Sequence, residues 1–262
     1  MKKSSEEIIV HQFLNSHEAS RYKTLLNILE MHNVDHYTEH GNHDTKNVIV
    51  SLTNETPYTL LVAHYDVFGS STGINDNTCA LALLIQIAKT LSKTNTTVPL
   101  KILFTDKEEQ GMYGSYDYAN KHQDEIQKVI VFDIIGYGDQ YFYGADQNAS
   151  QAFQFLNELG INRLSMVLPS DNLMFANAGI KSTLITALPN EDVQLQNQEY
   201  HLKASPKFVE SFHNNALDND INVINFDLIE RLRKTLIHNY SCSQDKCCKG
   251  LEHQLSNQII SS

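Results

Sequence analysis

The sequence predicts a single α/β domain, built on a mixed and mostly parallel β-sheet with helices on both faces. Short runs of strand-forming residues alternate with longer segments of helical periodicity along the chain. Several of these runs are apolar at every position, as expected for central strands that are covered on both faces. The chain has 262 residues, of which 41% are hydrophobic, and this is enough to fill the core of one large domain.

Strand and helix signals follow one another in a regular order. The helix at residues 78–91 is almost uniformly apolar and should be buried, and the helix at 149–159 ends at Gly160. The final helix starts behind Asp218 or Asp220, either of which could cap it. The predicted strands are residues 36–38, 47–50, 58–63, 100–105, 129–132, 140–143, 164–168 and 182–187. The predicted helices are residues 5–32 (one or two helices), 78–91, 113–121, 149–159, 172–178 and 221–238.

Composition excludes several classes of function. The net charge of -11 argues against a nucleic-acid partner, which would need a basic face. The first residues lack the apolar segment of a secretory signal, and no run of about 18 apolar residues exists to span a membrane. Four cysteines do not form a disulfide framework in a chain of this size, so we expect a cytoplasmic protein. The catalytic domain is predicted to cover residues 1–240, and residues 241–262 to form a flexible tail.

Acidic and histidine side chains directly follow three of the predicted strands. The run YTLLVA is followed by His64 and Asp66, LKILFT by Glu108 and Glu109, and VIVF by Asp133. Because ligands bind outside the carboxyl ends of the strands in such sheets, we expect these side chains to share one rim.

Two more segments add to this group. The loop GINDN contributes Asp76 directly before a helix, and the late segment ESFHNNALDND contributes His213. Two histidines and three acids can hold two divalent ions roughly 3.5–4 Å apart, which clamp and activate one water molecule. A further carboxylate beside the ligands can accept the proton of that water. Adjacent glutamates supply both: one ligand and one base.

The segments AHYD, GINDN, DKEEQGMYGS, VFDIIG, SDNLMFANAGI and FH occur in an order, and at separations, that resemble the zinc aminopeptidases of the bacterial leucyl aminopeptidase and aminopeptidase Y type. The resemblance covers roughly residues 46–235. A single HxD motif would mean little, but GINDN and EEQGMYGS in order behind AHYD are a specific combination. The resemblance implies a three-layer zinc exopeptidase fold and two divalent ions, with zinc as the expected metal.

The resemblance also implies a role for each matched residue. His64 and Asp133 would complete one metal site, Glu109 and His213 the other, and Asp76 would bridge them.

Two matched residues would serve catalysis without binding a metal. Glu108 would be the general base and acid, and Asp66 would hold the second imidazole nitrogen of His64 and fix its tautomer. The peptide bond between Asp76 and Asn77 would be cis, as it is in the family.

The sequence departs from the family pattern behind the last histidine. The family usually has threonine after this histidine and aspartate four positions on, whereas here Asn214 follows His213 and the aspartate, Asp218, comes one place later. We therefore expect His213 to remain a ligand, and the loop beside the substrate to differ in shape.

Each of these residues also has an ordinary structural interpretation. Asp76 and Asp171 could simply cap the helices behind them, although Asp171 lies in a segment that borders the substrate pocket in the family. Glu108 and Glu109 could form a solvated turn. Asp133 is harder to explain in this way, because it lies in an apolar run where an unpaired charge is costly.

Other polar clusters are expected to be structural. We interpret His36, His40 and His43 as an exposed strand and turn, and Cys79 as a small core residue. The remaining cysteines lie in the predicted tail without a partner at zinc-finger spacing: Cys242, Cys247 and Cys248.

The favoured function is an aminopeptidase that acts on peptides with a free N-terminus. A glutaminyl-cyclase-like acyl transferase would use the same ligands, but its relatives line the pocket with tryptophan, and this chain has Trp 0. A non-catalytic binding domain would be indicated by the loss of a ligand or of the base, and all of them are present. Deacylase and carboxypeptidase specificities remain alternatives.

Overall fold

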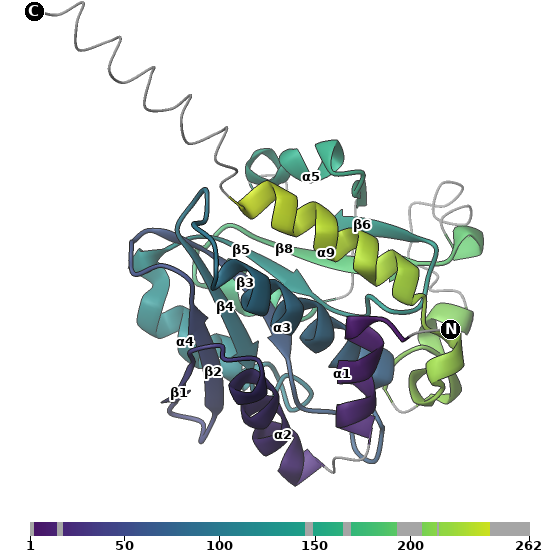
Figure 1. The fold of residues 1–262 in the computed structure, drawn as a ribbon. Helices are drawn as coiled ribbons and strands as arrows, with labels where there is room; N and C mark the ends of the chain where they lie inside the picture. The colour runs from purple at the N-terminus through teal and green to yellow at the C-terminus, as the bar shows by residue number, and fades with distance from the viewer. Residues whose placement is uncertain are drawn as a thin grey trace, which may run out of the picture.

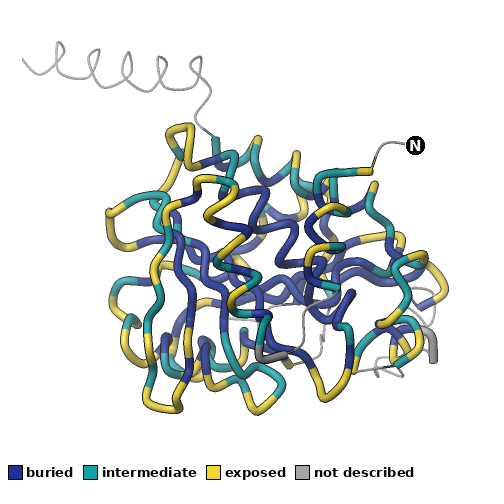
Figure 2. The backbone as a smooth tube through the Cα atoms, turned by 60° about the horizontal axis from the view of Figure 1, so that its bottom comes forward, coloured by how far each residue is buried: buried dark blue, intermediate teal, exposed yellow. Residues whose placement is uncertain are grey.

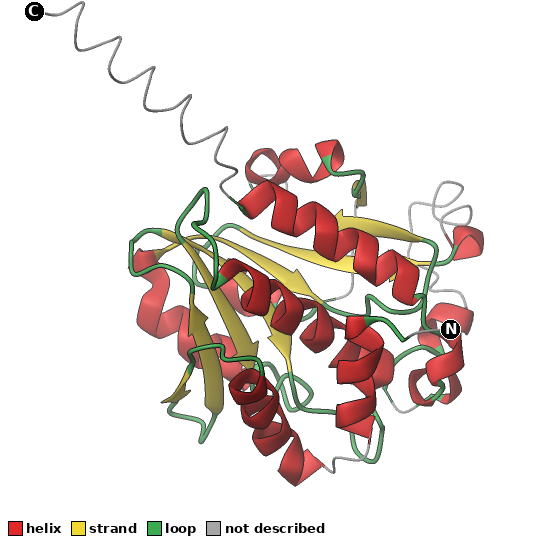
Figure 3. Cartoon of the chain, viewed as in Figure 1, coloured by secondary structure: helices red, strands yellow, loops and turns green. Residues whose placement is uncertain are grey.

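A sheet of eight strands lies between two layers of helices in the described part of the chain (Figure 1; Figure 3). The computed structural model describes residues 3–14, 18–144, 149–164, 169–192, 206–213 and 215–241. This architecture confirms the predicted fold class. Among these residues, no helix combines the length and the apolar character needed to cross a bilayer.

The elements follow one another in an alternating order. The strands are β1 (Tyr37–His40), β2 (Lys46–Ser51), β3 (Tyr58–His64), β4 (Leu100–Thr105), β5 (Ile126–Phe132), β6 (Gln140–Gly144), β7 (Asn162–Leu164) and β8 (Ser182–Leu188). The α-helices are α1 (Ser5–Leu14), α2 (Glu18–Met31), α3 (Cys79–Leu91), α4 (Tyr113–His122), α5 (Phe155–Glu158), α6 (Asn172–Asn177), α8 (Pro206–Val209) and α9 (Phe226–Tyr240). Short helical turns are η1 (Ile74–Thr78), η2 (Gln123–Glu125), η3 (Ser150–Phe153), η4 (Ala216–Asn219) and η5 (Ile221–Val223).

The centre of the sheet is parallel, and its margins contain antiparallel pairs. The strand order is β1-β2-β4-β3-β5-β8-β6-β7. Strands β4, β3, β5 and β8 run parallel to one another, whereas β1 pairs antiparallel with β2, β2 with β4, and β6 with β8. The four central strands therefore end at the same rim of the sheet, as the sequence predicts.

Alternate side chains of each central strand face opposite helical layers. In β3, Leu61 and Ala63 belong to the cluster that contains α1, α2, α3 and α9. Leu60 and Val62 face the other side, where they pack with Tyr118 of α4 and with α6. Because both faces are covered, every residue of β3 is buried. Figure 2 shows that the buried backbone gathers at the centre and that the exposed segments lie at the loop tips.

The last helix differs from the prediction, because it begins at Phe226 rather than at residue 221. The side chain of Asn225 caps it by accepting a backbone N–H at 3.1 Å. Asp220 caps only the short turn η5, through the backbone N–H of Asn222 at 2.9 Å. The chain thus contains two successive cap residues, and apolar periodicity does not distinguish which of them starts the long helix.

The helix predicted over residues 149–159 is two short pieces, η3 and α5. The hydrogen bonds from Ala152 to Ala149 and from Gln154 to Gln151 span three residues, which tightens the first turn into a 3₁₀ helix. Gly160 follows with a positive φ of 79°, as expected at the end of a helix. The next strand, β7, covers Asn162–Leu164. Residues 165–168 of the predicted strand lie outside the described residues, as do residues 242–262 of the predicted tail.

Candidate active site

Three neighbouring parallel strands deliver side chains to one rim. β3 ends at His64, which pairs in register with Thr105 at the end of β4. The loop that leaves β4 carries Glu108 and Glu109, and Asp133 directly follows β5. The rim is therefore a direct consequence of the register of β3, β4 and β5.

The structure brings all the predicted metal ligands and Glu108 together. Among the described residues, three groups of three side chains have their N or O atoms within 4.8 Å of one another. The groups are His64 with Glu108 and Glu109, His64 with Asp76 and Asp133, and Asp76 with Glu109 and His213. His64, Asp76 and Glu109 each belong to two of these groups, but only Asp76 is shared by the group with Asp133 and the group with His213, as expected of a bridging carboxylate.

His64 and Asp133 form the buried half of this cluster. Nε2 of His64 lies 3.1 Å from Oδ1 of Asp76 and 3.4 Å from Oδ1 of Asp133. The hydroxyl of Ser170 donates to the other oxygen of Asp133 at 2.7 Å. Burial opposes the charged imidazole, but Asp133 and the other carboxylates outweigh it and raise the pKa of His64 well above its ordinary value.

His213 and Glu109 form the more open half. Nε2 of His213 lies 3.5 Å from Oε2 of Glu109 and 4.0 Å from Oδ2 of Asp76, and its side chain is 50% exposed. The backbone N–H of His213 also donates to Oδ2 of Asp76 at 3.3 Å. Burial and the neighbouring Asp76 raise the pKa of Glu109 to about 8. One side of this half is therefore open to a ligand from solvent.

Glu108 is a carboxyl group in an acidic, partly buried environment. Burial raises its pKa well above the ordinary value, and Asp133, Asp171 and Asp76 raise it further. A carboxylate whose pKa is shifted upward is a stronger base than an ordinary carboxylate, as a proton acceptor requires.

Asp66 connects His64 to the two glutamates. Nδ1 of His64 lies 3.2 Å from the backbone oxygen of Asp66 and 3.4 Å from its carboxylate oxygen. The same carboxylate accepts the backbone N–H groups of Glu108 and Glu109, each at 3.1 Å. Asp66 therefore positions three rim residues, two more than the sequence predicts.

The turn that carries Asp76 is held from both ends. Its peptide bond to Asn77 is cis, as the resemblance implies, and the Asn77 side chain donates to the backbone oxygen of Phe132 at 2.8 Å. Asp218 accepts the backbone N–H groups of Asn75 and Asp76 at 3.0 Å each. The N-cap position of α3 is Thr78, and no side chain caps this helix, so the interpretation of Asp76 as its cap is wrong.

Asp218 and Ser170 are parts of the site that the sequence analysis missed. Asp218 was considered only as a helix cap and as a displaced family residue, yet it is buried and holds Asp76 in place. Ser170 is the first residue of the segment SDN, directly before Asp171, and this position is the sequence signal for its role.

Asp171 does not cap α6, which corrects the ordinary interpretation of this residue. The α6 terminus has no side-chain cap, and Asp171 instead accepts the hydroxyl of Thr105 at 2.5 Å. It is fully buried, and this burial raises its pKa to about 6. Because Thr105 pairs in register with His64, this hydrogen bond places Asp171 beside the rim.

The residues that the sequence analysis set aside lie apart from this cluster. His43 pairs with Asp117, with Nδ1 2.6 Å from Oδ1, and stacks on Tyr113. His36 and His40 are not part of any metal-competent group within the described ranges. Cys79 is free and buried in α3, as predicted, and Cys242, Cys247 and Cys248 lie outside the described residues.

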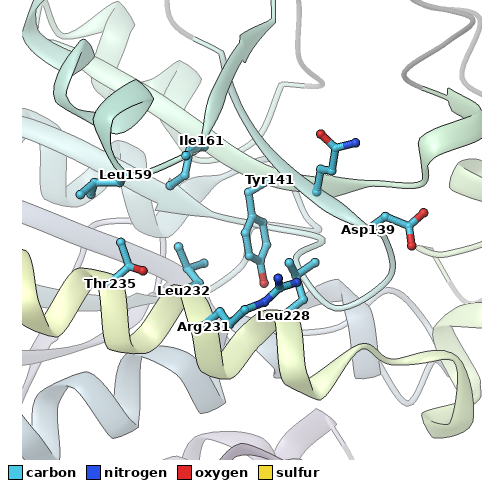
Figure 4. A pocket seen from close by; sticks show the side chains of 10 residues that line it. Asp139, Tyr141, Leu159, Ile161, Leu228, Arg231, Leu232 and Thr235 are labelled. Carbon is cyan, nitrogen blue, oxygen red and sulfur yellow. The ribbon is translucent and has the colours of Figure 1, made fainter.

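A separate hollow lies between β6 and α9 (Figure 4). Its volume is about 320 Å³, and leucines of α9 line one wall. Figure 4 shows the ring of Tyr141 standing between the strand and the helix, beside Arg231. None of the rim residues lines this hollow, so the chemistry of the chain lies elsewhere.

The rim fits divalent metal ions. Oδ1 of Asp133 and Oε1 of Glu109 are buried without a hydrogen-bond partner, and an unsatisfied buried carboxylate oxygen is costly. A cation in each half of the rim would satisfy the oxygen that lies there. Imidazole and carboxylate donors are the ligands that Zn²⁺ takes in hydrolytic sites.

Sequence comparisons relate the chain to peptidases. Peptidase family M28 matches residues 47–238 of the chain. A vacuolar membrane protease of Meyerozyma guilliermondii is 35% identical over 84 residues, which are 30% of this chain and 9% of that protein. The chain therefore matches less than a tenth of the length of this curated relative.

Solved structures with the same fold have different activities. The LapA aminopeptidase of Legionella pneumophila has a TM-score of 0.68 at 13% identity, over 89% of this chain and 69% of that one. A glutaminyl cyclase of Porphyromonas gingivalis has a TM-score of 0.68 at 18% identity, over 90% and 96%. A Zn-dependent exopeptidase of Parabacteroides distasonis has a TM-score of 0.67 at 15% identity, over 89% and 95%. These similarities confirm the predicted fold.

Proposed function

Because this chain belongs to peptidase family M28, we propose that it is a zinc-dependent aminopeptidase that removes N-terminal residues from peptides. The family assignment agrees with the metal-dependent exopeptidase that the sequence predicts. The observation that carries the proposal is the sharing of Asp76 between two metal-competent groups at the open rim. A single tetrahedral zinc site needs at most four protein ligands, and five are present here.

In this proposal the five ligands divide as the sequence analysis assigns them. His64 and Asp133 would hold the buried ion, Glu109 and His213 would hold the more exposed one, and Asp76 would serve both. When bound, such ions polarise the substrate carbonyl and lower the pKa of a water molecule.

Glu108 is the proposed proton carrier. It accepts a proton from the attacking water and later donates it to the nitrogen of the leaving amine as the carbon–nitrogen bond breaks. The upward shift of its pKa, which comes mainly from burial, supports this role because it raises the basicity of the carboxylate. Asp66 holds the backbone of Glu108 in place.

Zinc and the free amine are the finer parts of the proposal. Zinc is supported by the donor set and by the Zn-dependent exopeptidase among the structures of the same fold. A cationic amino terminus suits the acidic rim and the net charge of -11. We also propose a cytoplasmic location, for which the support is the free Cys79.

A glutaminyl-cyclase-like acyl transferase is the second candidate. The Porphyromonas gingivalis cyclase resembles this chain as closely in fold as the LapA aminopeptidase does. The absence of tryptophan from the whole sequence favours the peptidase, because cyclase relatives line their pockets with this residue.

A substrate panel distinguishes the candidates. The purified chain is supplied with zinc and assayed on aminoacyl peptides, on the same peptides with an acetylated N-terminus, and on peptides with N-terminal glutamine. We expect release of the first residue from free peptides only, and loss of this activity in the presence of a chelator. Cyclisation of N-terminal glutamine without hydrolysis would favour the acyl transferase, and equal cleavage of acetylated peptides would contradict an aminopeptidase.

A further inference from the structure

Arg21 lies outside the residues matched by the family, yet its side chain is buried against the active-site loops. It belongs to α2, and only 1% of its surface is exposed. Its guanidinium donates to the backbone oxygen of Tyr65 at 2.6 Å and to the hydroxyl of Thr78 at 2.8 Å. A longer contact, at 3.4 Å, reaches the backbone oxygen of Thr72. All three acceptors are within the loops that carry proposed metal ligands.

These acceptors flank two separate parts of the rim. Tyr65 stands between His64 and Asp66 in the chain, and Thr72 and Thr78 flank the turn that contains Asp76. The hydroxyl of Thr78 in turn donates to the backbone oxygen at the start of that turn, at 2.5 Å. A planar guanidinium has its donors in a fixed geometry. The contacts of Arg21 therefore fix the loop after β3 relative to the turn that carries the shared carboxylate.

Arg21 also places a positive charge beneath a crowded set of carboxylates. The acids that act on it are Asp66, Asp218 and Asp76. Burial lowers the pKa of Arg21 to about 10 against the effect of these acids, so the side chain is charged at neutral pH. Its guanidinium also lies 5.1 Å from the centre of the Phe13 ring, which adds a cation–π contact.

A buried charge of this kind is expensive unless its partners are well placed, and it is weak evidence for stability alone. A hydrophobic side chain would fill the same space without that desolvation cost. The hydrogen bonds to both loops indicate instead that the guanidinium holds these loops in place, and its charge offsets the repulsion among the acids of the rim.

We propose that Arg21 is a positioning residue of the metal centre, which sets the distance between His64 and Asp76 before any metal binds. This inference rests on the proposed function, because it presumes that the rim binds divalent ions. Partners that orient metal ligands from behind typically change metal affinity by about 10–100-fold when they are removed. The loss of Arg21 should therefore weaken metal binding even when the chain still folds.

The test compares Arg21→Met with Arg233→Met. Arg233 pairs with the buried Glu6, with Nε 2.5 Å from Oε1, and neither residue belongs to a metal-competent group. Both substitutions remove an arginine whose side chain bonds to a buried group. Only Arg21 contacts the loops of the rim. Zinc affinity is measured by competition with a chromophoric chelator, and the melting temperature of each metal-free protein is measured alongside it.

We expect both variants to melt at lower temperature than the wild type, and only Arg21→Met to bind zinc about 10–100-fold more weakly. Arg21→Lys retains the charge but not the planar set of donors, and we expect it to weaken zinc binding at least about threefold at a melting temperature closer to the wild type. If Arg21→Met does not fold, Arg21→Lys decides the question alone.

Zinc affinity within twofold of the wild type in folded Arg21 variants would overturn the proposal. An equal loss of affinity in Arg233→Met would do the same, because the effect would then follow general stability. A wild-type chain that binds no zinc would instead contradict the proposed function, so the two failures are distinguishable.

Discussion

The backbone N–H of Glu108 donates a hydrogen bond to the carboxylate of Asp66 at 3.1 Å. The same carboxylate lies beside the imidazole of His64, so one side chain orients a proposed ligand and the proposed base.

Asp66→Asn replaces one acceptor oxygen by an NH₂ group that cannot accept these N–H donors. We expect turnover to fall about 10–100-fold with the fold retained. The control is Asp220→Asn, which alters the cap of η5 and should leave kcat unchanged. Equal kcat values for the two variants would contradict the positioning role of Asp66.

The hydroxyl of Ser170 donates a hydrogen bond to Oδ2 of Asp133 at 2.7 Å. Ser170→Ala removes this bond and frees the carboxylate to rotate, so we expect zinc affinity to fall about tenfold. Ser182→Ala removes a serine hydroxyl that bonds instead to the backbone of Asn172, and it should not change the affinity. Isothermal titration of the metal-free proteins measures both. Unchanged affinity in Ser170→Ala would show that Asp133 needs no such support.

The sequence predicts that the proposed metal ligands gather at one rim, because they lie at fixed places relative to the strands. His64 ends a buried strand and Asp133 directly follows another, and parallel pairing through β3 and β5 brings such residues together. The pairing of the strands could be expected from their apolar runs, since central strands of an α/β sheet are covered on both faces. The proposed division of the ligands between two metal sites rests on the family resemblance, because periodicity does not indicate it.

The supporting contacts could not be predicted in this way. Arg21, Ser170 and Asp218 reach the rim from segments that are distant in sequence, and their contacts depend on tertiary packing. The start of α9 was misplaced for a local reason, since both Asp220 and Asn225 are able to cap a helix. Short polar residues have several structural uses, and sequence alone does not choose among them.

Glu108 and Glu109 should respond differently to the same substitution. Glu108→Gln removes the proton acceptor and leaves the shape, so we expect both metals to stay bound and turnover to fall by at least about 100-fold. Glu109→Gln removes a ligand that faces His213, so metal content should fall together with activity. Metal analysis and steady-state kinetics on both variants provide the measurement. The opposite pattern, with metal lost only from Glu108→Gln, would reverse the two roles.

Asp117 provides a test of pH dependence away from the metal centre. Burial disfavours its ionised form, but hydrogen bonds from His43 and Thr45 outweigh this effect and lower its pKa. Between the folded and the unfolded pKa of Asp117, the unfolded chain binds more protons than the folded chain. The contribution of Asp117 to the free energy of unfolding is therefore present above about pH 4, and it is lost as the pH falls through the folded pKa. Urea unfolding of the wild type and of Asp117→Asn should show a stability difference at pH 7 that shrinks below pH 4. A difference that stays constant across this range would contradict the assignment.

The number of zinc ions bound per chain tests the central claim most directly. The structure offers two half-sites that share Asp76, one around His64 and one around His213. Metal-free protein is titrated with zinc, and the bound metal is measured by elemental analysis after removal of the excess. We expect two ions per chain, and a ratio near one for His213→Ala, whose buried half-site is intact. A ratio that stays at one in the wild type under excess zinc would contradict a two-metal aminopeptidase and would favour the cyclase-like alternative.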